Sequence, residues 1–158
     1  MSGPSVFPEL PPGLETRGGW KLTADESERN RRSIYIFVRR NTRYPMFETF
    51  DMPDTHESCA RRNNTISSTQ ALELLNNELV VGWARTLAEK VHNDSGLTPA
   101  AQIERTWRLV YSRVPSAKET QAATAFLDKQ TPIAGDRQAA FADLCHMLLN
   151  SNEFVYIN

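Results

Sequence analysis

The sequence predicts a mainly α-helical protein: an antiparallel bundle of about four helices over residues 67–154, preceded by an extended arm and one short strand or hairpin. After residue 67, apolar residues recur at steps of three and four, as they do on one face of a helix. Before residue 30, prolines and glycines exclude regular helix and central strand. By pattern, the chain divides into an arm (1–30), a strand and polar loop region (31–66) and a helical bundle (67–158).

The arm is expected to be extended. Its turn-forming residues are Gly3, Pro4, Pro8, Pro11, Pro12, Gly13, Gly18 and Gly19. Such a stretch lies over another surface more readily than it forms its own core, and Val6, Phe7, Leu10 and Trp20 would be its anchors. It lacks the basic and apolar regions of a signal peptide. We interpret the chain as one structural unit, the C-terminal fragment of a larger domain.

A β-strand is predicted over Arg32–Arg40. Its β-branched and aromatic residues are typical of strands, and the continuous apolar centre from Ile34 to Val38 predicts burial on both faces. A strand needs a hydrogen-bonding partner. The candidates are the arm, the segment near Phe47–Phe50, and chain outside this sequence.

The first predicted helix begins at a capping box formed by Ser67 and Gln70 and continues to about His92. Its apolar stripe is Leu72, Leu75, Leu79, Trp83, Leu87 and Val91. The second helix begins at Thr98-Pro99, an N-cap followed by proline at the first helical position. Its inward residues are Ile103, Trp107, Val110 and Tyr111.

The third helix begins at a second capping box, Ser116 and Glu119. Ala122, Phe126 and Leu127 are expected to face inward, and Thr131–Gly135 is expected to turn the chain. A fourth helix follows, with one apolar face made of Phe141, Leu144, Cys145 and Leu148. Short connections between the four helices favour antiparallel neighbours.

Composition excludes several classes of protein. The 158 residues carry a formal net charge of −1, which argues against a dedicated nucleic-acid binder. No apolar run approaches the ~18 residues that a membrane-spanning helix needs. The two cysteines, Cys59 and Cys145, provide no disulfide framework, and reduced thiols are favoured over a single bridge.

Residues 50–64 concentrate the ligand-type side chains of the chain. Asp51, Asp54, His56, Glu57 and Cys59 offer oxygen, nitrogen and sulfur atoms. Their spacing matches no C-x-x-C, H-E-x-x-H or EF-hand pattern, and their mixture of hard and soft ligands selects no one metal. We therefore assign no metal site and no catalytic residue from the sequence.

This block is where the sequence places a ligand site. The candidate ligand-binding residues are Asp51, Asp54, His56, Cys59, Arg39, Arg61 and Arg62. If the chain is a fragment of a redox or hydrolytic enzyme, these residues line its site, and Arg39 or Arg61 orients an anionic substrate. The simpler interpretation places the aspartates in turns around Pro53, paired with the arginines.

Arginines are also enriched between Arg29 and Arg43, with Tyr35, Phe37 and Tyr44 among them. Basic and aromatic residues in alternation can bind polyanions. The simpler interpretation is that these arginines flank the strand and pair with the acids after Phe50.

Two series of motifs resemble a known family. The first series is Arg32–Arg40, Phe50–Asp54 with Ser58-Cys59 and an arginine at 61 or 62, and Thr69–Asn76. The second series is Glu104–Glu119 and Ala142–Phe154. In their order, these motifs resemble the C-terminal part of a large planctomycete domain of unknown function. The resemblance extends from about Gly3 to Phe154.

That family occurs in exported proteins that also carry a planctomycete-type cytochrome c domain and sometimes a carbohydrate-binding module. The resemblance therefore implies a bacterial periplasmic or cell-surface protein linked to polysaccharide use or electron transfer. It assigns no catalytic residue. Haem is expected only on a separate domain of full-length relatives, since this chain has no C-x-x-C-H motif, and we expect no cofactor here.

Three functions are compatible with these patterns. We favour a non-catalytic helical interaction or structural module that binds the remainder of a larger protein, another surface protein or a polysaccharide. It predicts an exposed apolar face near the strand or arm. The alternatives are a fragment of a redox or hydrolytic enzyme with a site around Asp51–Arg62, and a polyanion-binding module that uses the Arg29–Arg43 region.

Overall fold

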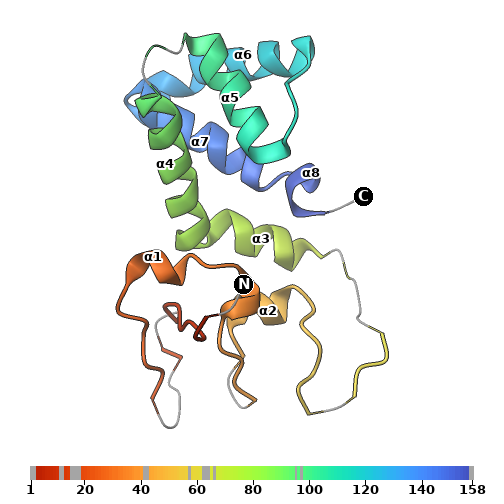
Figure 1. Ribbon diagram of the computed structural model, residues 1–158. Helices are drawn as coiled ribbons and strands as arrows, with labels where there is room; N and C mark the ends of the chain where they lie inside the picture. The colour runs from red at the N-terminus through yellow and green to blue at the C-terminus, as the bar shows by residue number, and fades with distance from the viewer. Residues whose placement is uncertain are drawn as a thin grey trace. The chain divides into compact units, whose positions relative to one another are not determined.

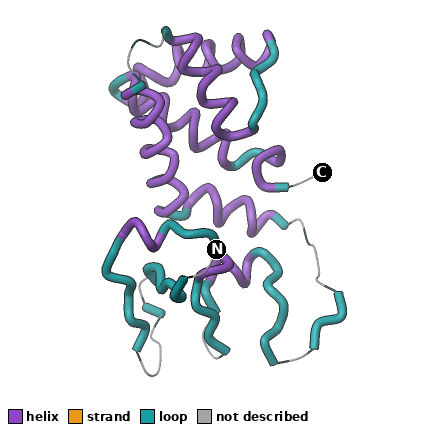
Figure 2. The backbone as a smooth tube through the Cα atoms, in the orientation of Figure 1, coloured by secondary structure: helices purple, strands orange, loops and turns teal. Residues whose placement is uncertain are grey.

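The computed structural model describes residues 3–10, 13–14, 19–40, 43–56, 58–61, 65, 67–94, 96 and 98–156. Figures 1 and 2 show that its regular structure is helical, and the described residues contain no β-strand longer than an isolated bridge. The predicted mainly helical fold is confirmed. The chain separates into two compact units, Met1–Ile66 and Ser67–Asn158, which are described in turn.

The C-terminal unit is a helical bundle. Its helices are α3 (Ser68–Asn76), α4 (Glu78–Asn93), α5 (Pro99–Tyr111), α6 (Ala117–Ala134), α7 (Arg137–Leu149) and α8 (Asn152–Val155). Helix α7 packs chiefly against α4 and α6, and it supplies the largest share of the core (Figure 1). Its predicted apolar face is confirmed, because Phe141, Leu144, Cys145 and Leu148 are all buried.

The predicted helix starts are confirmed. Ser67 and Ser116 each cap a helix in a reciprocal capping box, and the Thr98 hydroxyl accepts from the Ala101 N–H. These side chains satisfy N–H groups that have no partner within the helix. Local sequence therefore sets where α3, α5 and α6 begin.

The single long helix predicted from residue 67 to about 92 is wrong. Asn77 has extended backbone (φ −72°, ψ 120°), ends α3 and caps α4 through its side chain, which accepts from the Leu79 N–H at 2.9 Å. Because the break interrupts the helical repeat, the predicted stripe does not continue across it. In α3, Leu72 and Leu75 are 60% and 51% exposed. In α4, the buried face includes Ala84 and Ala88, which are not part of the predicted stripe.

Two details of α6 also differ from prediction. Leu127 is buried and Phe126 packs against the core as expected, whereas Ala122 is exposed and Ala123 is buried instead. Helix α6 continues through Pro132 to Ala134, although residues 131–135 were expected to turn the chain. The helix then ends at Gly135, whose φ of 94° suits glycine.

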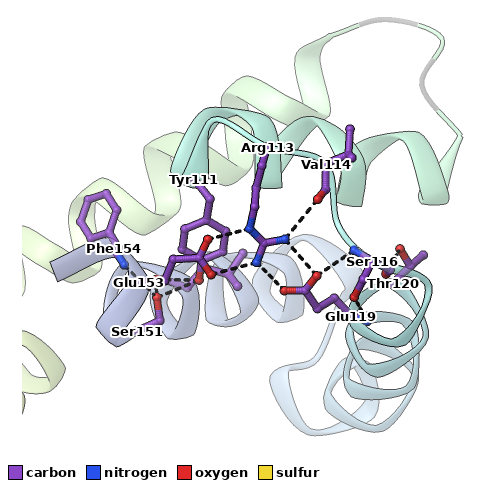
Figure 3. Close-up of polar contacts among 10 residues, drawn as sticks. Tyr111, Arg113, Val114, Ser116, Glu119, Thr120, Ser151, Glu153 and Phe154 are labelled. Carbon is purple, nitrogen blue, oxygen red and sulfur yellow. Dashed lines mark hydrogen bonds and ion pairs between the residues drawn. The ribbon is translucent and has the colours of Figure 1, made fainter. Parts of the chain in front are cut away.

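Arg113, in the connection between α5 and α6, forms ion pairs with a residue of α6 and a residue of α8 (Figure 3). Its guanidinium donates to the Glu119 carboxylate at 2.6 and 3.0 Å and to the Glu153 carboxylate at 2.6 and 2.8 Å. Hydrogen bonds from Arg113 first, and then from Ser116, hold the pKa of Glu119 well below its usual range. The pKa of Glu153 is lowered chiefly by Arg113. Beside them, the Tyr111 hydroxyl lies 2.8 Å from the Ser151 hydroxyl.

The N-terminal unit contains only short elements among its described residues. They are α1 (Glu26–Arg29), the 3-10 helix η1 (Ser33–Tyr35) and α2 (Pro45–Thr49). An isolated parallel bridge joins Val6 to Ile36, in which the Val6 N–H donates to the Tyr35 carbonyl at 2.8 Å and the Phe37 N–H donates to the Val6 carbonyl at 2.9 Å.

The predicted strand over Arg32–Arg40 is wrong. Its first half is η1, and Ile34 is 83% exposed, so the expected burial on both faces is absent. Of the expected partners, the arm is the one that supplies the bridge, whereas Phe47 lies in helix α2. Within the described residues, no sheet covers the apolar side chains of this segment.

The extended arm contacts the rest of its unit through the expected anchors. Val6 is 1% exposed, and Phe7 packs against Trp20 and Phe37 with ring centroids 5.2 and 4.9 Å apart. The Trp20 indole N–H donates to the Pro8 carbonyl at 2.6 Å. These contacts fold the arm back on itself and onto the segment around Ile36.

Candidate functional site

The ligand-type block follows helix α2, where Asp51 reverses the chain direction. Asp51 has a φ of 56°, in the left-handed region that aspartate tolerates better than most residues. One of its carboxylate oxygens accepts from both the N–H and the hydroxyl of Thr65, each at 2.7 Å. Asp51 therefore closes a loop from residue 51 to 65.

Asp54 has a similar local role. Its carboxylate accepts from the His56 N–H at 2.9 Å, as in an Asx turn, and forms an ion pair with Arg43 at 2.7 Å. The His56 N–H, followed by Arg43, lowers the pKa of this carboxyl. From the sequence, a turn was expected around Pro53, with its aspartates paired either with Arg61 and Arg62 or with arginines of the 29–43 region. In the structure, Arg43 is the arginine paired with Asp54.

The other candidate residues are distributed around the same turn. The His56 ring nitrogen Nε2 lies 3.3 Å from the Arg40 carbonyl oxygen. The exposed Cys59 thiol donates to the Arg61 carbonyl at 3.2 Å. Arg39 is half-buried. Arg62 lies outside the described residues.

Four of the candidates line one open, polar hollow of about 520 Å³: Asp51, Asp54, Cys59 and Arg61. Its described lining includes neither His56 nor Arg39. Within the described part of the chain, no group of three or more His, Cys, Asp or Glu residues is placed to hold a metal ion. What the hollow brings together is chiefly a set of turn-forming side chains.

Several arginines of the 29–43 region are engaged by acids. Arg29 pairs with Glu9 at 3.7 Å, and Arg31 pairs with Glu28 at 3.0 Å while lying 3.9 Å above the Tyr35 ring centroid. With Arg43 bound to Asp54, part of the positive charge expected to attract a polyanion is neutralised locally.

An exposed apolar face was expected near the strand or arm, but its residues were not identified from the sequence; the structure forms an apolar groove there. It has a volume of about 490 Å³ and is lined by Ser33, Ile34, Ile36, Val38, Met46, Phe47, Phe50, Met52 and Pro53. One wall is the segment from Ile34 to Val38, and the other comes from α2 and the residues after it. We define these residues as the apolar groove.

The groove could have been predicted from two apolar segments of the sequence, residues 34–38 and 46–52. The first was interpreted as a buried strand because a continuous apolar run resembles one. The structure instead leaves Ile34, Phe37 and Val38 at 83%, 37% and 39% exposure. Exposed apolar side chains that gather beside a concave surface are typical of interaction sites.

In the described part of the chain, no helix is long and apolar enough to cross a membrane. A family model described as "Protein of unknown function (DUF1553)" matches residues 1–127. The match includes the first motif series and Glu104–Glu119, whereas Ala142–Phe154 lies beyond it. Comparison with curated proteins and with solved structures finds no match.

Proposed function

The chain belongs to the DUF1553 family of proteins of unknown function, and we propose that it acts as a non-catalytic interaction module that binds an apolar polypeptide segment. The observation that carries this proposal is the apolar groove of the N-terminal unit. A folded protein gains free energy by covering such side chains, at roughly 25 cal/mol per Å² of apolar surface removed from water.

The state of the ligand-type block supports a non-catalytic role. The carboxylates of Asp51 and Asp54 accept hydrogen bonds from neighbouring backbone and from Thr65, and Asp54 also pairs with Arg43. The Cys59 thiol donates to a backbone carbonyl at 3.2 Å, and the His56 ring contacts another. General acid–base or nucleophilic chemistry needs a base within hydrogen-bonding reach of the reacting group. The contacts of this block serve turn formation instead.

The groove walls favour an extended polypeptide as the occupant. Beyond η1, the side chains of Ile36 and Val38 lie two residues apart on the same wall, as they would along an extended chain. The Val6 bridge already shows that this segment accepts an extended neighbour in parallel. A second extended segment could contact the groove with alternate side chains.

Charge near the groove further defines the occupant. Arg32 and Arg40 flank the Ile34–Val38 wall in sequence, and their side chains form no ion pair or hydrogen bond in the described structure, unlike those of Arg29 and Arg31. An apolar segment flanked by carboxylates is therefore the complementary partner. The resemblance to exported planctomycete proteins supports a periplasmic or cell-surface setting linked to polysaccharide use, with the remainder of a larger protein as the source of that segment.

Site-specific photo-cross-linking tests this function. A photo-reactive residue in place of Ile34 should yield one dominant polypeptide adduct in cells that express the chain. The adduct should fall at least about tenfold when Val38→Asp places a charge in the groove. The cross-linked segment, made as a synthetic peptide, should then bind the purified chain and lose its affinity when its own carboxylates are replaced by amides.

The matched control places the photo-reactive residue at Leu72, which is 60% exposed in the C-terminal unit. Equal labelling from both positions, or an adduct that survives Val38→Asp, contradicts the proposal. Asp54→Asn and His56→Ala should leave the adduct unchanged, since these residues do not line the groove. If either of these two variants no longer formed the adduct, the result would instead favour a binding site at the polar hollow.

A further inference from the structure

A separate hollow of about 220 Å³ lies in the C-terminal unit, among residues of α4, α5 and α7. Its apolar lining includes Ala88 and Phe141, which belong to the core and are 1% and 6% exposed. The hollow therefore reaches down to the packed interior of the bundle. Because packed helices hold its walls, the shape of the floor is fixed before a ligand arrives.

Polar side chains form the rest of the lining: His92, Gln102, Arg137 and Gln138. They come from the end of α4 and the first turns of α5 and α7. In the described structure, none of these four side chains forms a hydrogen bond or an ion pair. Each can donate a hydrogen bond, and Arg137 brings a permanent positive charge.

The acids closest in sequence form other contacts and do not pair with Arg137. Asp136, which precedes Arg137, accepts from the Ala139 N–H at 2.8 Å. Asp94, two residues after His92, pairs with Arg105 at 3.1 Å. No carboxylate is among the described lining residues. The hollow thus combines an apolar floor with a rim of unpaired donors and one unpaired guanidinium.

We propose that this hollow is a binding site for a small carboxylate that carries an apolar group. The apolar part contacts Phe141 and Ala88, and the carboxylate pairs with the Arg137 guanidinium, which can donate two parallel hydrogen bonds. Gln102 and Gln138 supply further donors at the rim. A neutral molecule of the same shape would keep the floor contacts and lose the charge-assisted bonds. This proposal is independent of the apolar groove, since it concerns different residues.

Titration with sodium benzoate, followed by NMR of the isotope-labelled full chain, tests the site. Benzoate should shift amide signals around Phe141 and Arg137 saturably, with one ligand per chain. Benzamide has the same ring without the charge and should bind at least about tenfold more weakly. Arg137→Gln should weaken benzoate binding by a similar factor and leave benzamide binding unchanged.

Arg108→Gln is the matched control, because Arg108 is exposed on α5 and pairs with Glu104 at 2.8 Å. This variant should bind benzoate as the unchanged chain does. The proposal is overturned if benzamide binds as well as benzoate, if Arg137→Gln and Arg108→Gln behave alike, or if the shifted signals lie away from the hollow. Because Arg137 is exposed, the Arg137→Gln variant should remain folded, and its NMR signals away from residue 137 should keep their positions.

Discussion

The two units of the chain use apolar residues in opposite ways. In the C-terminal unit, α4 to α7 direct them into one core in which Val91, Leu127 and Leu144 have no exposed surface. In the N-terminal unit, the described buried hydrophobic residues are Val6 and Tyr44, while Ile34 is 83% exposed beside the apolar groove. Apolar content is therefore a poor guide to burial unless the segment also has a covering partner.

The two cysteines provide the sharpest test of this contrast. Cys145 is fully buried in the C-terminal core, and burial raises the pKa of its thiol to about 12. Cys59 is exposed in the N-terminal unit. Because only the thiolate reacts, a thiol reagent at neutral pH should modify Cys59 more than about a thousandfold faster than Cys145, which must wait for the core to open.

The measurement is a time course of thiol modification in the native chain and in denaturant. One equivalent should react quickly in the native chain, and Cys59→Ser should abolish that phase. Two fast equivalents in the native chain would show that the core around Cys145 opens readily, and the contrast between the units would be wrong.

Leu127→Ala should produce the largest loss of stability. Its side chain is fully buried in the C-terminal core, so truncation leaves a cavity that costs about 2–5 kcal/mol. Denaturant unfolding of the C-terminal unit measures this loss. Leu72→Ala removes the same atoms from a side chain that is 60% exposed, and it should change stability by no more than about 0.5 kcal/mol.

Hydrogen exchange extends the Leu127→Ala experiment to both units. Amides of α5 and α7 should exchange faster in the variant. The Phe37 amide, which donates to the Val6 carbonyl at 2.9 Å, should be unaffected if the units unfold separately. Equal acceleration in both units would show that they unfold as one.

Arg113→Gln should have the smallest effect, confined to the C-terminal unit and dependent on pH. The pKa values of Glu119 and Glu153 are lowered by Arg113, so their stabilising contribution is present above the unfolded-state value of about 4.3. It is lost as pH falls through the lower folded-state values. Unfolding curves of the two proteins should therefore differ near pH 7 and converge in strong acid.

The side chains are partly exposed, so the difference should be well below that of Leu127→Ala. Arg105→Gln breaks another exposed pair, with Asp94, and serves as the control. Because this variant leaves Glu119 and Glu153 paired with Arg113, its curve should stay parallel to that of the unchanged chain. A constant offset for Arg113→Gln at every pH would refute the role of Glu119 and Glu153.

The parts of the fold that could be predicted are those determined by local sequence. Helix starts at Ser67, Thr98 and Ser116 follow from capping side chains that act over three residues. The inward face of α7 follows from the 3.6-residue repeat within one unbroken helix. In these places, local preference and tertiary packing agree.

The parts that could not be predicted depend on contacts between distant segments. Asn77 breaks the helix even though the apolar spacing continues across it; Leu75 before the break is exposed, and Ala84 after it is buried. Whether Ile34–Val38 becomes a strand depends on a partner, and among the described residues the arm meets this segment through the Val6–Ile36 bridge and not through a strand. Asp54 was expected in a turn, and its ion pair with Arg43 agrees with the expectation that arginines between Arg29 and Arg43 pair with acids after Phe50. The spacing did not identify which arginine pairs with which acid.

The position of α7 in the bundle affects where a fragment of this chain can end. The family match ends at residue 127, inside α6, whereas α7 begins at Arg137. A fragment that stops where the match stops would leave Ala84, Ala88 and Val91 facing water, because the helix that covers them would be missing. Such a fragment would expose apolar surface that α7 covers in the full chain, and we expect it to associate with itself. The end of the family match is therefore not the end of the folded unit, which also includes α7 and α8.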